Sequence, residues 1–409
     1  MSRITLSPER QLKELQTGTD EIISPGELLK KLKKSWESQV PLTVKLGADP
    51  SCPDLHLGHA VVLNKLRQLQ EFGHRICFVI GDFTAMIGDP TGKSKTRPHL
   101  SAEEVRQNAE TYKQQVFKIL DPEKTELLCN SEWLNKLSPA DMIRLLASRT
   151  LQQIIAREDF ARRYQEQSPI HLHELIYPVM QAYDSVVLKA DIELGGTDQK
   201  FNLLVGREMQ RQSGQEPQCL ILCPLLEGLD GVQKMSKSLN NYIGLNDQPH
   251  DIFGKVMSVS DQHMLRFFEL LSRKDTAALA TIRQGLGDGT LHPMQVKQDL
   301  AQEIVSHYWG SEAAAAARTH FETVFSKRSL PDELTEFQTS PGKDGMINLP
   351  ELLVSVGFSD SKSAARRIMK QNGLRIDGQT VSSENISRNS GETFVLRQGK
   401  LKMIRILVR

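Results

Sequence analysis

The chain has 409 residues, of which 39% are hydrophobic and 25% are charged, and its formal net charge is +1. This length allows two or three domains with cores of their own, and the charge excludes a polybasic nucleic-acid binder. The sequence lacks a signal-like start and an apolar run of 18 residues, so we expect a cytoplasmic protein without a membrane partner. The five cysteines are scattered, and Cys219 with Cys223 lacks the second ligand pair of a zinc site. We therefore expect no disulfide framework and no tightly bound metal.

The first half of the chain begins with the pattern strand, helix, strand. Residues 44–48, which are uncharged apart from Lys45, are predicted to form a buried strand, and residues 75–82 a second strand that contains the apolar run 76–80. From His59 onward, apolar residues recur every three to four positions, as they do on one face of a helix. This order and spacing predict a parallel sheet and hence an α/β fold with a doubly wound, Rossmann-like domain.

Further helices and strands follow this first unit. Residues 101–167 have a helical period that begins with Ser101 as a predicted N-cap, and we interpret them as a helical insertion. Residues 247–325 have the composition of a helical block. A helix, a strand, a helix and a strand are predicted between these two regions, at 170–184, 190–196, 201–212 and 219–224. We expect a sheet domain over 1–228 and a second domain over 229–330 that contains a loop and the helices.

The C-terminal end differs from the rest of the chain in charge. Residues 331–344 contain prolines and glycine with little periodicity, which is typical of a linker. Residues 345–409 contain eleven lysines and arginines against five acids, although the whole chain carries only +1. We therefore expect a separate small domain with a basic face that contacts nucleic-acid phosphates.

Two short strings that lie far apart are the most informative feature of the chain. The four residues from His56 to His59, His-Leu-Gly-His, stand where a strand turns into a helix, and a helix N-terminus favours phosphate. Gly58 lets a nucleotide approach the backbone closely. Residues 234–238, Lys-Met-Ser-Lys-Ser, place two lysines on a glycine-flanked loop. A mobile cationic loop suits a reaction in which charge builds up on departing pyrophosphate.

Three other stretches supply groups for a small polar ligand and a ribose. Tyr177, Gln181 and Asp184 are spaced so that they share one face of a helix. Asp89 follows a tight apolar turn, and we interpret it as a carboxylate that faces a ligand ammonium. The string Gly-Gly-Thr-Asp-Gln ends a strand and opens a helix, so its glycines would admit a ribose whose hydroxyls donate to Asp198. The alternative for this last string is an ordinary glycine turn with a helix cap.

Together these strings resemble the bacterial tyrosyl-tRNA synthetases, a family of class I aminoacyl-tRNA synthetases. The resemblance runs from about residue 29 to residue 409. The most similar segments are 45–59, 81–93, 177–184, 195–202 and 234–238. In addition, residues 349–381 resemble a small α+β RNA-binding fold shared with a small-subunit ribosomal protein.

The resemblance implies an activity and its partners. The enzyme would form tyrosyl-adenylate from tyrosine and ATP with Mg²⁺, release pyrophosphate, and transfer tyrosine to the 3′ end of tRNA(Tyr). Catalysis would take place in the domain over 1–228, and the domain over 345–409 would bind the tRNA. The helical insertion at about 101–167 would form the face of a homodimer.

The resemblance also implies a role for each candidate residue. The reacting phosphates would be stabilised by His56, His59, Lys234 and Lys237. ATP would be bound by Gly58, Gly196, Asp198, Lys234, Met235, Ser236 and Lys237. Tyrosine would be bound by Asp49, Asp89, Tyr177, Gln181, Asp184 and Gln199. Among these, Asp184 would accept the phenolic hydroxyl.

One position departs from the best-known bacterial members of this family. Those members carry a tyrosine on the first strand as a second partner of the phenol, whereas this chain has Lys45 at the matching place. A second bacterial branch carries lysine there, and the chain resembles that branch. The second contact to the phenol is therefore unassigned.

Three other functions stay open at the level of the sequence. A tryptophanyl-tRNA synthetase has the same architecture, but Asp184 and the basic C-terminal domain favour tyrosine. A small-metabolite nucleotidyltransferase shares the His-x-Gly-His element, but the lysine loop and the C-terminal domain argue against it. A non-catalytic RNA-binding protein on a dead synthetase scaffold would not need intact histidines and lysines. Amino-acid-dependent pyrophosphate exchange distinguishes these alternatives.

Overall fold

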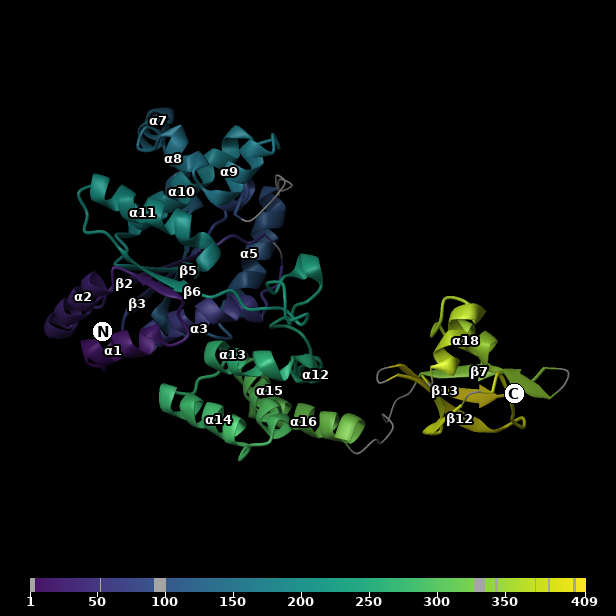
Figure 1. Ribbon diagram of the computed structural model, residues 1–409. Coiled ribbons are helices and arrows are strands. Elements are labelled where there is room, and N and C mark those ends of the chain that lie inside the picture. The colour runs from purple at the N-terminus through teal and green to yellow at the C-terminus, as the bar shows by residue number, and fades with distance from the viewer. Residues whose placement is uncertain are drawn as a thin grey trace. The chain divides into compact units, whose positions relative to one another are not determined.

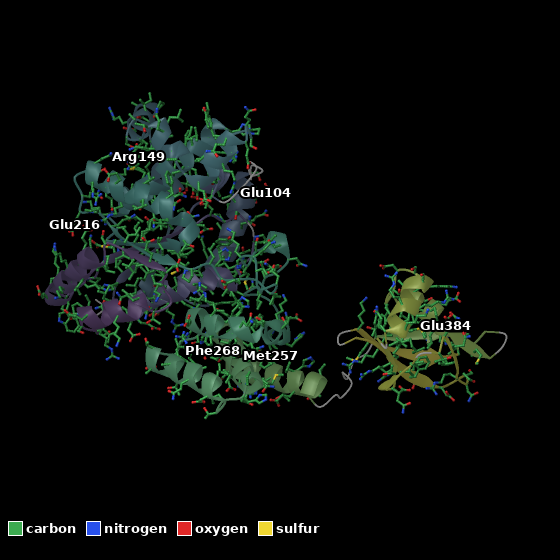
Figure 2. The ribbon with its side chains drawn as sticks, in the orientation of Figure 1. Glu104, Arg149, Glu216, Met257, Phe268 and Glu384 are labelled. Carbon is green, nitrogen blue, oxygen red and sulfur yellow. The ribbon has the colours of Figure 1, made fainter. Side chains whose placement is uncertain are left out.

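The computed structural model in Figure 1 describes residues 4–51, 53–91, 101–326, 335–342, 345–371, 373–381, 383–399 and 402–409. Contacts within the chain divide it into two compact units, Met1–Thr319 and His320–Arg409. Each unit has a buried apolar core of its own. Phe268 is buried in the first unit, whereas Glu104 in the first unit and Glu384 in the second are exposed (Figure 2).

A six-stranded sheet with the order β1-β6-β5-β2-β3-β4 forms the centre of the first unit. Its strands are β1 Glu21–Ile23, β2 Thr43–Ala48, β3 Arg75–Ile80, β4 Thr125–Cys129, β5 Ile192–Gly196 and β6 Cys219–Cys223. Strands β2 to β6 pair in parallel, and the edge strand β1 pairs antiparallel with β6. The strand order reverses between β2 and β5, which is the place where doubly wound sheets bind ligands. The predicted α/β class is confirmed.

Helices cover both faces of this sheet. Helices α10 Leu172–Leu188 and α11 Lys200–Gln212 pack on one face, and α3 Leu57–Glu71 packs on the other (Figure 1). Strand β6 is buried along its whole length, and β3 is buried apart from its first residue. Parallel strands that are covered on both faces have continuous apolar sequences, which is why these strands could be predicted from their composition.

The remaining helices of the first unit lie before, between and after these elements. They are α1 Pro8–Gln16, α2 Pro25–Ser38, α4 Thr84–Ile87, η2 Thr197–Gln199, η3 Lys237–Leu239, α12 Pro249–Ser258, α13 Asp261–Leu271, α14 Thr276–Asp288, α15 Pro293–Trp309 and α16 Ser311–Phe321, with a π-helical turn η4 Glu322–Ser326 at the boundary. The helical block predicted for 247–325 is thus present. Helix α13 packs against α3, and the block belongs to the same compact unit as the sheet. A boundary at residue 228 stays a prediction.

The predicted helical insertion at 101–167 contains a strand, so this part of the prediction is wrong. Strand β4 pairs with β3 and completes the sheet at its edge. It has five residues, none of them fully buried, and so it lacks the long apolar run that marks the central strands. The rest of the segment is helical, with α5 Ala102–Val116, η1 Pro122–Lys124, α6 Ser131–Leu134, α7 Pro139–Leu146, α8 Leu151–Ile155 and α9 Glu158–Gln165.

The second unit is a small α+β structure, as the resemblance implies. Its five-stranded sheet has the order β10-β9-β12-β13-β7, and a two-stranded sheet joins β11 and β8. The elements are β7 Glu336–Thr339, β8 Met346–Asn348, α17 Leu349–Ser355, α18 Lys362–Lys370, β9 Leu374–Ile376, β10 Gln379–Thr380, β11 Asn385–Ser387, β12 Thr393–Gln398 and β13 Lys402–Val408. Every second residue of β13 is buried in the core that α17 and α18 share.

The segment 331–344, which the sequence predicts to be a linker, contains strand β7. This strand pairs in parallel with β13, so the linker prediction is wrong for it. Residues 331–334 and 343–344 of the segment lie outside the described residues. Within the described part of the chain, none of the helices combines the length and the apolarity needed to span a bilayer.

Candidate active site

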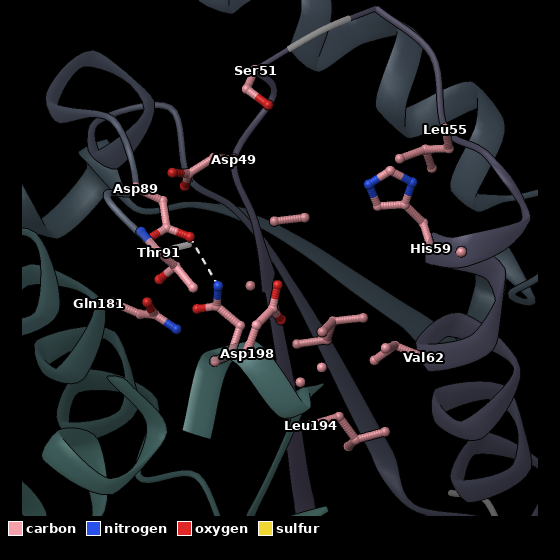
Figure 3. Close-up of a pocket in the computed structure, with 18 of the residues that line it drawn as sticks. Asp49, Ser51, Leu55, His59, Val62, Asp89, Thr91, Gln181, Leu194 and Asp198 are labelled. Atoms are coloured by element: carbon pink, nitrogen blue, oxygen red, sulfur yellow. Dashed lines mark hydrogen bonds between the residues drawn. The ribbon is translucent and has the colours of Figure 1, made fainter. Parts of the chain in front are cut away.

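A cavity of about 760 Å³ lies at the carboxyl ends of the parallel strands, where the strand order reverses. Figure 3 shows His59 on one side of this cavity and Asp49, Asp89 and Gln181 on the other. The cavity brings together all of the residues to which the sequence analysis assigns a part in catalysis or binding: Asp49, His56, Gly58, His59, Asp89, Tyr177, Gln181, Asp184, Gly196, Asp198, Gln199, Lys234, Met235, Ser236 and Lys237. The segments after β2, β3, β5 and β6 leave the sheet at the same edge, and α10 adds Tyr177, Gln181 and Asp184.

The two histidines at the start of α3 are held in place by backbone hydrogen bonds. The backbone N–H of Gly58 donates to Nδ1 of His56 at 3.1 Å, and the backbone N–H of His56 donates to Nδ1 of His59 at 3.2 Å. The two ring centroids lie 4.0 Å apart. A Cβ at Gly58 would lie 2.9 Å from the His56 ring, so the glycine is needed to seat the first imidazole. Because Nδ1 accepts in both rings, each neutral ring carries its proton on Nε2 and presents a donor.

Burial keeps both imidazoles neutral at physiological pH. Burial, followed by the neighbouring His59 and the two lysines of the loop, lowers the pKa of His56 to about 2. Burial and the Lys237 ammonium lower the pKa of His59 to about 4. The histidines are therefore neutral hydrogen-bond donors, and the positive charge in this part of the cavity comes from the lysines.

Buried histidines make folding stability fall in mild acid. The pKa values of His56, His59, His74 and His307 lie at about 2, 4, 4 and 3, against an ordinary value of 6.5. As the pH falls below 6.5, the unfolded chain binds protons that the folded chain does not. The free energy of unfolding should then fall by up to about 1.4 kcal/mol per pH unit for each histidine. Burial raises the pKa of Asp184 to about 6, so protonation of this carboxyl stabilises the folded state as the pH falls. This is one group, whereas four histidines have the opposite effect on stability.

Urea denaturation at pH 7.5, 6 and 5 would measure this dependence. The expected result is a midpoint that moves to lower urea concentration with each step into acid, at an unchanged slope. A midpoint that stays constant or rises between pH 7.5 and pH 5 would show that these imidazoles are not buried in their neutral form.

The two lysines of the loop after β6 contact acids at the edge of the cavity. Nζ of Lys234 lies 3.1 Å from Oδ2 of Asp198, and Nζ of Lys237 lies 3.0 Å from Oδ2 of Asp54. All four side chains are partly exposed, and ion pairs of this kind contribute little stability. Another anion could therefore replace the two carboxylates at small cost. Asp54 is a residue that the sequence analysis did not single out.

The chain that follows the lysine loop (residues 234–238) is joined to the histidine motif by backbone pairing. His56 and Gly244 form an antiparallel bridge, and the N–H of Leu57 donates to the carbonyl of Ile243 at 2.9 Å. Met235 is 4% exposed and anchors the loop between the lysines. The lysines are thus tethered beside the imidazoles by contacts between segments almost 200 residues apart.

Helix α10 presents the three predicted ligand groups on one face, as their spacing predicts. Tyr177, Gln181 and Asp184 all line the cavity. The hydroxyl of Tyr177 donates to Oδ2 of Asp49 at 2.9 Å, and the hydroxyl of Thr84 on α4 donates to Oδ1 of the same carboxylate at 2.7 Å. Asp49 is therefore fixed from two elements, with its negative charge at the wall of the cavity.

Asp184 is 3% exposed and lies at the inner end of this face. Its Oδ1 accepts from Nε1 of Trp133 at 2.8 Å, and its Oδ2 accepts from Nδ2 of Asn130 at 3.4 Å. Burial raises the pKa of the carboxyl to about 6, although Lys45 and the two donors favour its charged form. The sequence analysis identified neither Trp133 nor Asn130. Asn130 directly follows β4, so recognition of that strand would have placed it at the ligand edge.

A chain of polar side chains forms the wall between β5 and α4. Nε2 of Gln199 donates to Oδ2 of Asp89 at 2.8 Å, a bond drawn as a dashed line in Figure 3. The backbone N–H of Thr91 donates to the other oxygen of Asp89 at 2.9 Å. A Cβ at Gly196 would lie 2.7 Å from Oδ1 of Asp198, so the glycine leaves this carboxylate room at the cavity rim.

Lys45, which occupies the position of a phenol contact in the best-known relatives, does not line the cavity. Its side chain is fully buried, and its Nζ lies 2.8 Å from Oε1 of Glu193, whose side chain is also buried. The same ammonium donates to the hydroxyl of Ser185 at 2.9 Å and to the carbonyl of Gln181 at 3.1 Å. These three acceptors match the three N–H donors of the ammonium.

The four cysteines in the described part of the chain are free thiols. Cys219 and Cys223 are buried free thiols, and burial raises the pKa of each to about 11. In the part of the chain that the structure describes, no three His, Cys, Asp or Glu side chains are grouped so that they could hold a metal ion.

Comparison with known proteins places this site in a family. Residues 37–326 match the family model described as tRNA synthetases class I (W and Y). The tyrosine–tRNA ligase of Oleidesulfovibrio alaskensis is 51% identical over 401 residues, which cover 98% of this chain and 99% of that protein. The tyrosine–tRNA ligase of Geobacter sulfurreducens is also 51% identical over 401 residues, with the same coverage of both chains.

Solved structures show the same fold. The tyrosyl-tRNA synthetase from Archaeoglobus fulgidus, solved in complex with L-tyrosine, matches with a TM-score of 0.61 at 23% identity and covers 76% of this chain and 99% of that one. A truncated mitochondrial tyrosyl-tRNA synthetase from Aspergillus nidulans matches with a TM-score of 0.65 at 18% identity and covers 78% of this chain and 95% of that one. With a family model that spans well over half of its length and relatives that align along nearly all of it, the chain belongs to the tyrosyl-tRNA synthetase family of class I aminoacyl-tRNA synthetases.

Proposed function

We propose that the chain is a tyrosine–tRNA ligase and that the cavity at the sheet edge is its active site. The enzyme activates tyrosine with ATP to tyrosyl-adenylate, releases pyrophosphate, and transfers tyrosine to the 3′ end of tRNA(Tyr). The observation that carries the proposal is that one cavity combines two histidines and two lysines with the helix face that carries Tyr177, Gln181 and Asp184. Family membership at 51% identity to curated tyrosine–tRNA ligases supports the same function.

The inner end of the cavity binds the amino acid. Above its pKa of about 6, Asp184 is an ionised acceptor, and the phenolic O–H of tyrosine donates to it. The ammonium of the substrate is held by the carboxylates and polar groups nearer the rim. These are Asp89, Tyr177 and Gln181, while Asp49 and Gln199 lie close to the amino acid and its carboxylate. Phenylalanine would leave the buried carboxylate without this donor, which is why the site rejects it.

The outer end of the cavity stabilises the reacting phosphates. A carboxylate oxygen of tyrosine forms a bond to the α-phosphorus of ATP, and the bond from this phosphorus to pyrophosphate breaks. His56 and His59 donate Nε2–H to phosphate oxygens, while Lys234 and Lys237 compensate the charge that builds up on the leaving group. Mg²⁺ enters with ATP as part of the substrate and neutralises phosphate charge. When Lys234 turns to the phosphates, Asp198 becomes available to the ribose hydroxyls, beside Gly196.

The protein accelerates both steps by positioning the reactants and by stabilising the charge that develops on them. In the second step, a ribose hydroxyl at the 3′ end of the tRNA attacks the activated carbonyl and displaces AMP. The adenylate is held by the same groups in both steps, so no covalent bond to the protein is needed.

The second unit supplies the surface for tRNA. Helix α18 is amphipathic, because Ala365 and Met369 are buried while its basic side chains are exposed. These are Lys362, Arg366, Arg367 and Lys370. A row of cations on one face suits the phosphates of folded RNA.

Removal of the second unit should separate the two steps. We expect a chain that ends at residue 326 to keep tyrosine-dependent ATP–pyrophosphate exchange, because the cavity lies within the first unit. Charging of tRNA(Tyr) should fall by about 10²-fold or more, since several phosphate contacts are lost. Truncation at 326 rather than at 345 avoids leaving β7 without its partner strand. Loss of exchange in a truncated chain with a native circular dichroism spectrum would contradict the assignment.

The proposed homodimer has a surface on which to form. Four large apolar side chains on α7, α8, α9 and α10 are 58% to 79% exposed. They are Ile143, Leu151, Tyr164 and Leu172. Exposed apolar groups gathered in one region are typical of a protein–protein interface. Sedimentation should give twice the chain mass, and Leu172→Glu should shift the equilibrium toward the monomer; sedimentation of the unaltered chain as a monomer would refute this interface.

The decisive test of the function is ATP–pyrophosphate exchange with the full chain and each of tyrosine, phenylalanine and tryptophan. We expect exchange with tyrosine and little with the other two. Exchange that depends on tryptophan would assign the other specificity of the same architecture, and absence of exchange with all three would indicate a non-catalytic protein.

A further inference from the structure

Lys45 and Glu193 form a buried ion pair directly behind the ligand-binding face of α10. Their side chains are 0% and 2% exposed, and Nζ lies 2.8 Å from Oε1. The pair bridges two central strands, because Lys45 is on β2 and Glu193 is the residue paired with it on β5. These strands flank the place where the cavity opens.

The ion pair contacts two successive turns of α10. Nζ of Lys45 donates to the carbonyl of Gln181 at 3.1 Å and to the hydroxyl of Ser185 at 2.9 Å. The same hydroxyl donates to Oε2 of Glu193 at 2.9 Å, and the amide of Gln218 donates to that oxygen as well. Asp184 lies between Gln181 and Ser185, the two helix residues that Lys45 contacts. The network thus fixes the turn that carries both Gln181 and Asp184.

Stability alone is a weak reason for this arrangement. Two charges taken out of water lose their hydration, and replacement of a buried ion pair by uncharged side chains of similar shape is often neutral or stabilising. A buried ion pair whose ammonium and carboxylate oxygens all have partners, as in Lys45 and Glu193, instead specifies one geometry. The geometry that Lys45 and Glu193 specify is the position of α10 against the sheet.

We propose that Lys45 and Glu193 are a positioning pair that sets the placement and the charge of Asp184, and through them the preference for a phenol. The inference rests on the proposed function of the cavity. Lys45 thus acts on the substrate indirectly, through Asp184, rather than by a contact of its own. The pair touches no substrate atom, so neither residue is catalytic.

The two charges of the pair act on Asp184 with opposite sign. Lys45 lowers the pKa of the Asp184 carboxyl, and Glu193 raises it. Lys45 faces Asp184 from β2 and Glu193 faces it from β5, while the groups contributed by the β4–α6 segment, Asn130 and Trp133, are neutral donors. Removal of one charge should therefore shift the titration of Asp184 in one direction, and removal of the other should shift it the opposite way.

Three variants of the full chain test the inference. Lys45→Met removes the cation, Glu193→Gln removes the anion, and the double variant removes both charges while glutamine keeps the hydrogen bonds to Ser185 and Gln218. Lys31→Met is the matched control, since Lys31 is another buried lysine, 4% exposed, whose Nζ lies 3.1 Å from Oδ1 of Asp191, and neither residue lines the cavity. Circular dichroism and thermal unfolding identify any variant that fails to fold; the double variant is the one designed to fold if Lys45→Met does not.

The readout is the KM for tyrosine in pyrophosphate exchange as a function of pH. In the unaltered protein, KM should rise as the pH falls through about 6, where Asp184 takes up a proton. Lys45→Met should move this rise to higher pH by about one unit or more, and Glu193→Gln should move it to lower pH. In the double variant the rise should return toward its original pH, because both opposing charges are gone.

The double variant should still bind tyrosine less well. We expect its KM for tyrosine to increase about tenfold, comparable to the loss of supporting groups behind a metal ligand, with the KM for ATP unchanged. Its preference for tyrosine over phenylalanine should fall by a similar factor. Lys31→Met should leave all of these quantities unchanged.

The outcomes separate this inference from the proposed function. If the unaltered chain shows no tyrosine-dependent exchange, the proposed function fails. If it does, but the double variant folds and keeps the original KM for tyrosine, pH profile and preference over phenylalanine, the positioning pair is refuted. If the pH at which KM rises shifts in the same direction in Lys45→Met and Glu193→Gln, the inference is refuted too. Opposite shifts are expected only if the two charges act on Asp184.

Discussion

Asp184→Asn is expected to remove most of the preference for tyrosine over phenylalanine while it stabilises the folded protein at pH 7.5. The carboxylate is the acceptor that phenylalanine leaves without a donor, and a pocket without such a group distinguishes isosteres that differ by one hydroxyl by only about 10²-fold. Tyrosyl-tRNA synthetase is itself the standard example of this effect at about 10⁵-fold, so that magnitude is taken from this type of enzyme. The preference should fall from that range toward about 10².

The gain in stability follows from the sign of the pKa shift. Burial raises the pKa of Asp184 from 3.8 to about 6, so the folded state pays for the charged form above pH 6. The neutral asparagine keeps its bond to Trp133 and should raise the free energy of unfolding by about 1 to 3 kcal/mol at pH 7.5. This gain should vanish as the pH falls toward 4, where the carboxyl is protonated in the folded state.

Pyrophosphate exchange with tyrosine and phenylalanine and urea denaturation at pH 7.5 and 4.5 measure both effects. Asp141→Asn is the control, because Asp141 is a partly exposed aspartate in the first turn of α7 that does not line the cavity. If Asp184→Asn keeps the original preference for tyrosine, the carboxylate is not the acceptor. If its gain in stability over the unaltered protein is smaller at pH 7.5 than at pH 4.5, the carboxylate is not buried in its charged form.

Lys237→Ala is expected to slow adenylate formation by about 10²- to 10³-fold, the cost of losing one preorganised group that stabilises developing charge. The effect should appear in kcat, since the charge on pyrophosphate arises as its bond to the α-phosphorus breaks. Stability should hardly change, because the partner of Lys237 in the free protein is the partly exposed Asp54. His59→Ala should slow the same step for the same reason, through the loss of the Nε2 donor.

Lys200→Ala is the matched control for the lysine loop. Lys200 also forms an ion pair with a partly exposed acid, Glu21, at 2.6 Å, but neither residue lines the cavity. Single-turnover formation of tyrosyl-adenylate should be unchanged in this variant. If Lys237→Ala forms tyrosyl-adenylate as fast as Lys200→Ala and the unaltered protein do, Lys237 takes no part in the reaction.

The parts of the fold that could be predicted are those in which local pattern and tertiary environment agree. Strands β3 and β6 are covered on both faces, so their apolar composition alone indicates buried parallel strands. Strand β4 is an edge strand of five partly exposed residues, and β7 is a polar strand of four, so neither carries such a signal. Both depend on a partner strand, β3 and β13, for their hydrogen bonds.

The same distinction holds within the site. The candidate residues could be selected from the sequence because each lies in a short string with its own spacing, such as the i, i+4 and i+7 positions of Tyr177, Gln181 and Asp184. Asn130, Trp133 and Asp54 lie in no such string. They reach their partners at Asp184 and Lys237 through contacts between distant segments.

From the order of its residues the chain determines where the strands and helices of the sheet unit form, which side chains share a helix face, and that a phosphate-binding turn and a cationic loop exist. Tertiary structure alone decides which of these side chains are neutral, which are charged, and which partner each one has. Hydrophobic periodicity is a local property that repeats along the chain. Burial and ion pairing, by contrast, depend on residues brought together across the sheet, as with Lys45, Glu193 and the carboxyl of Asp184.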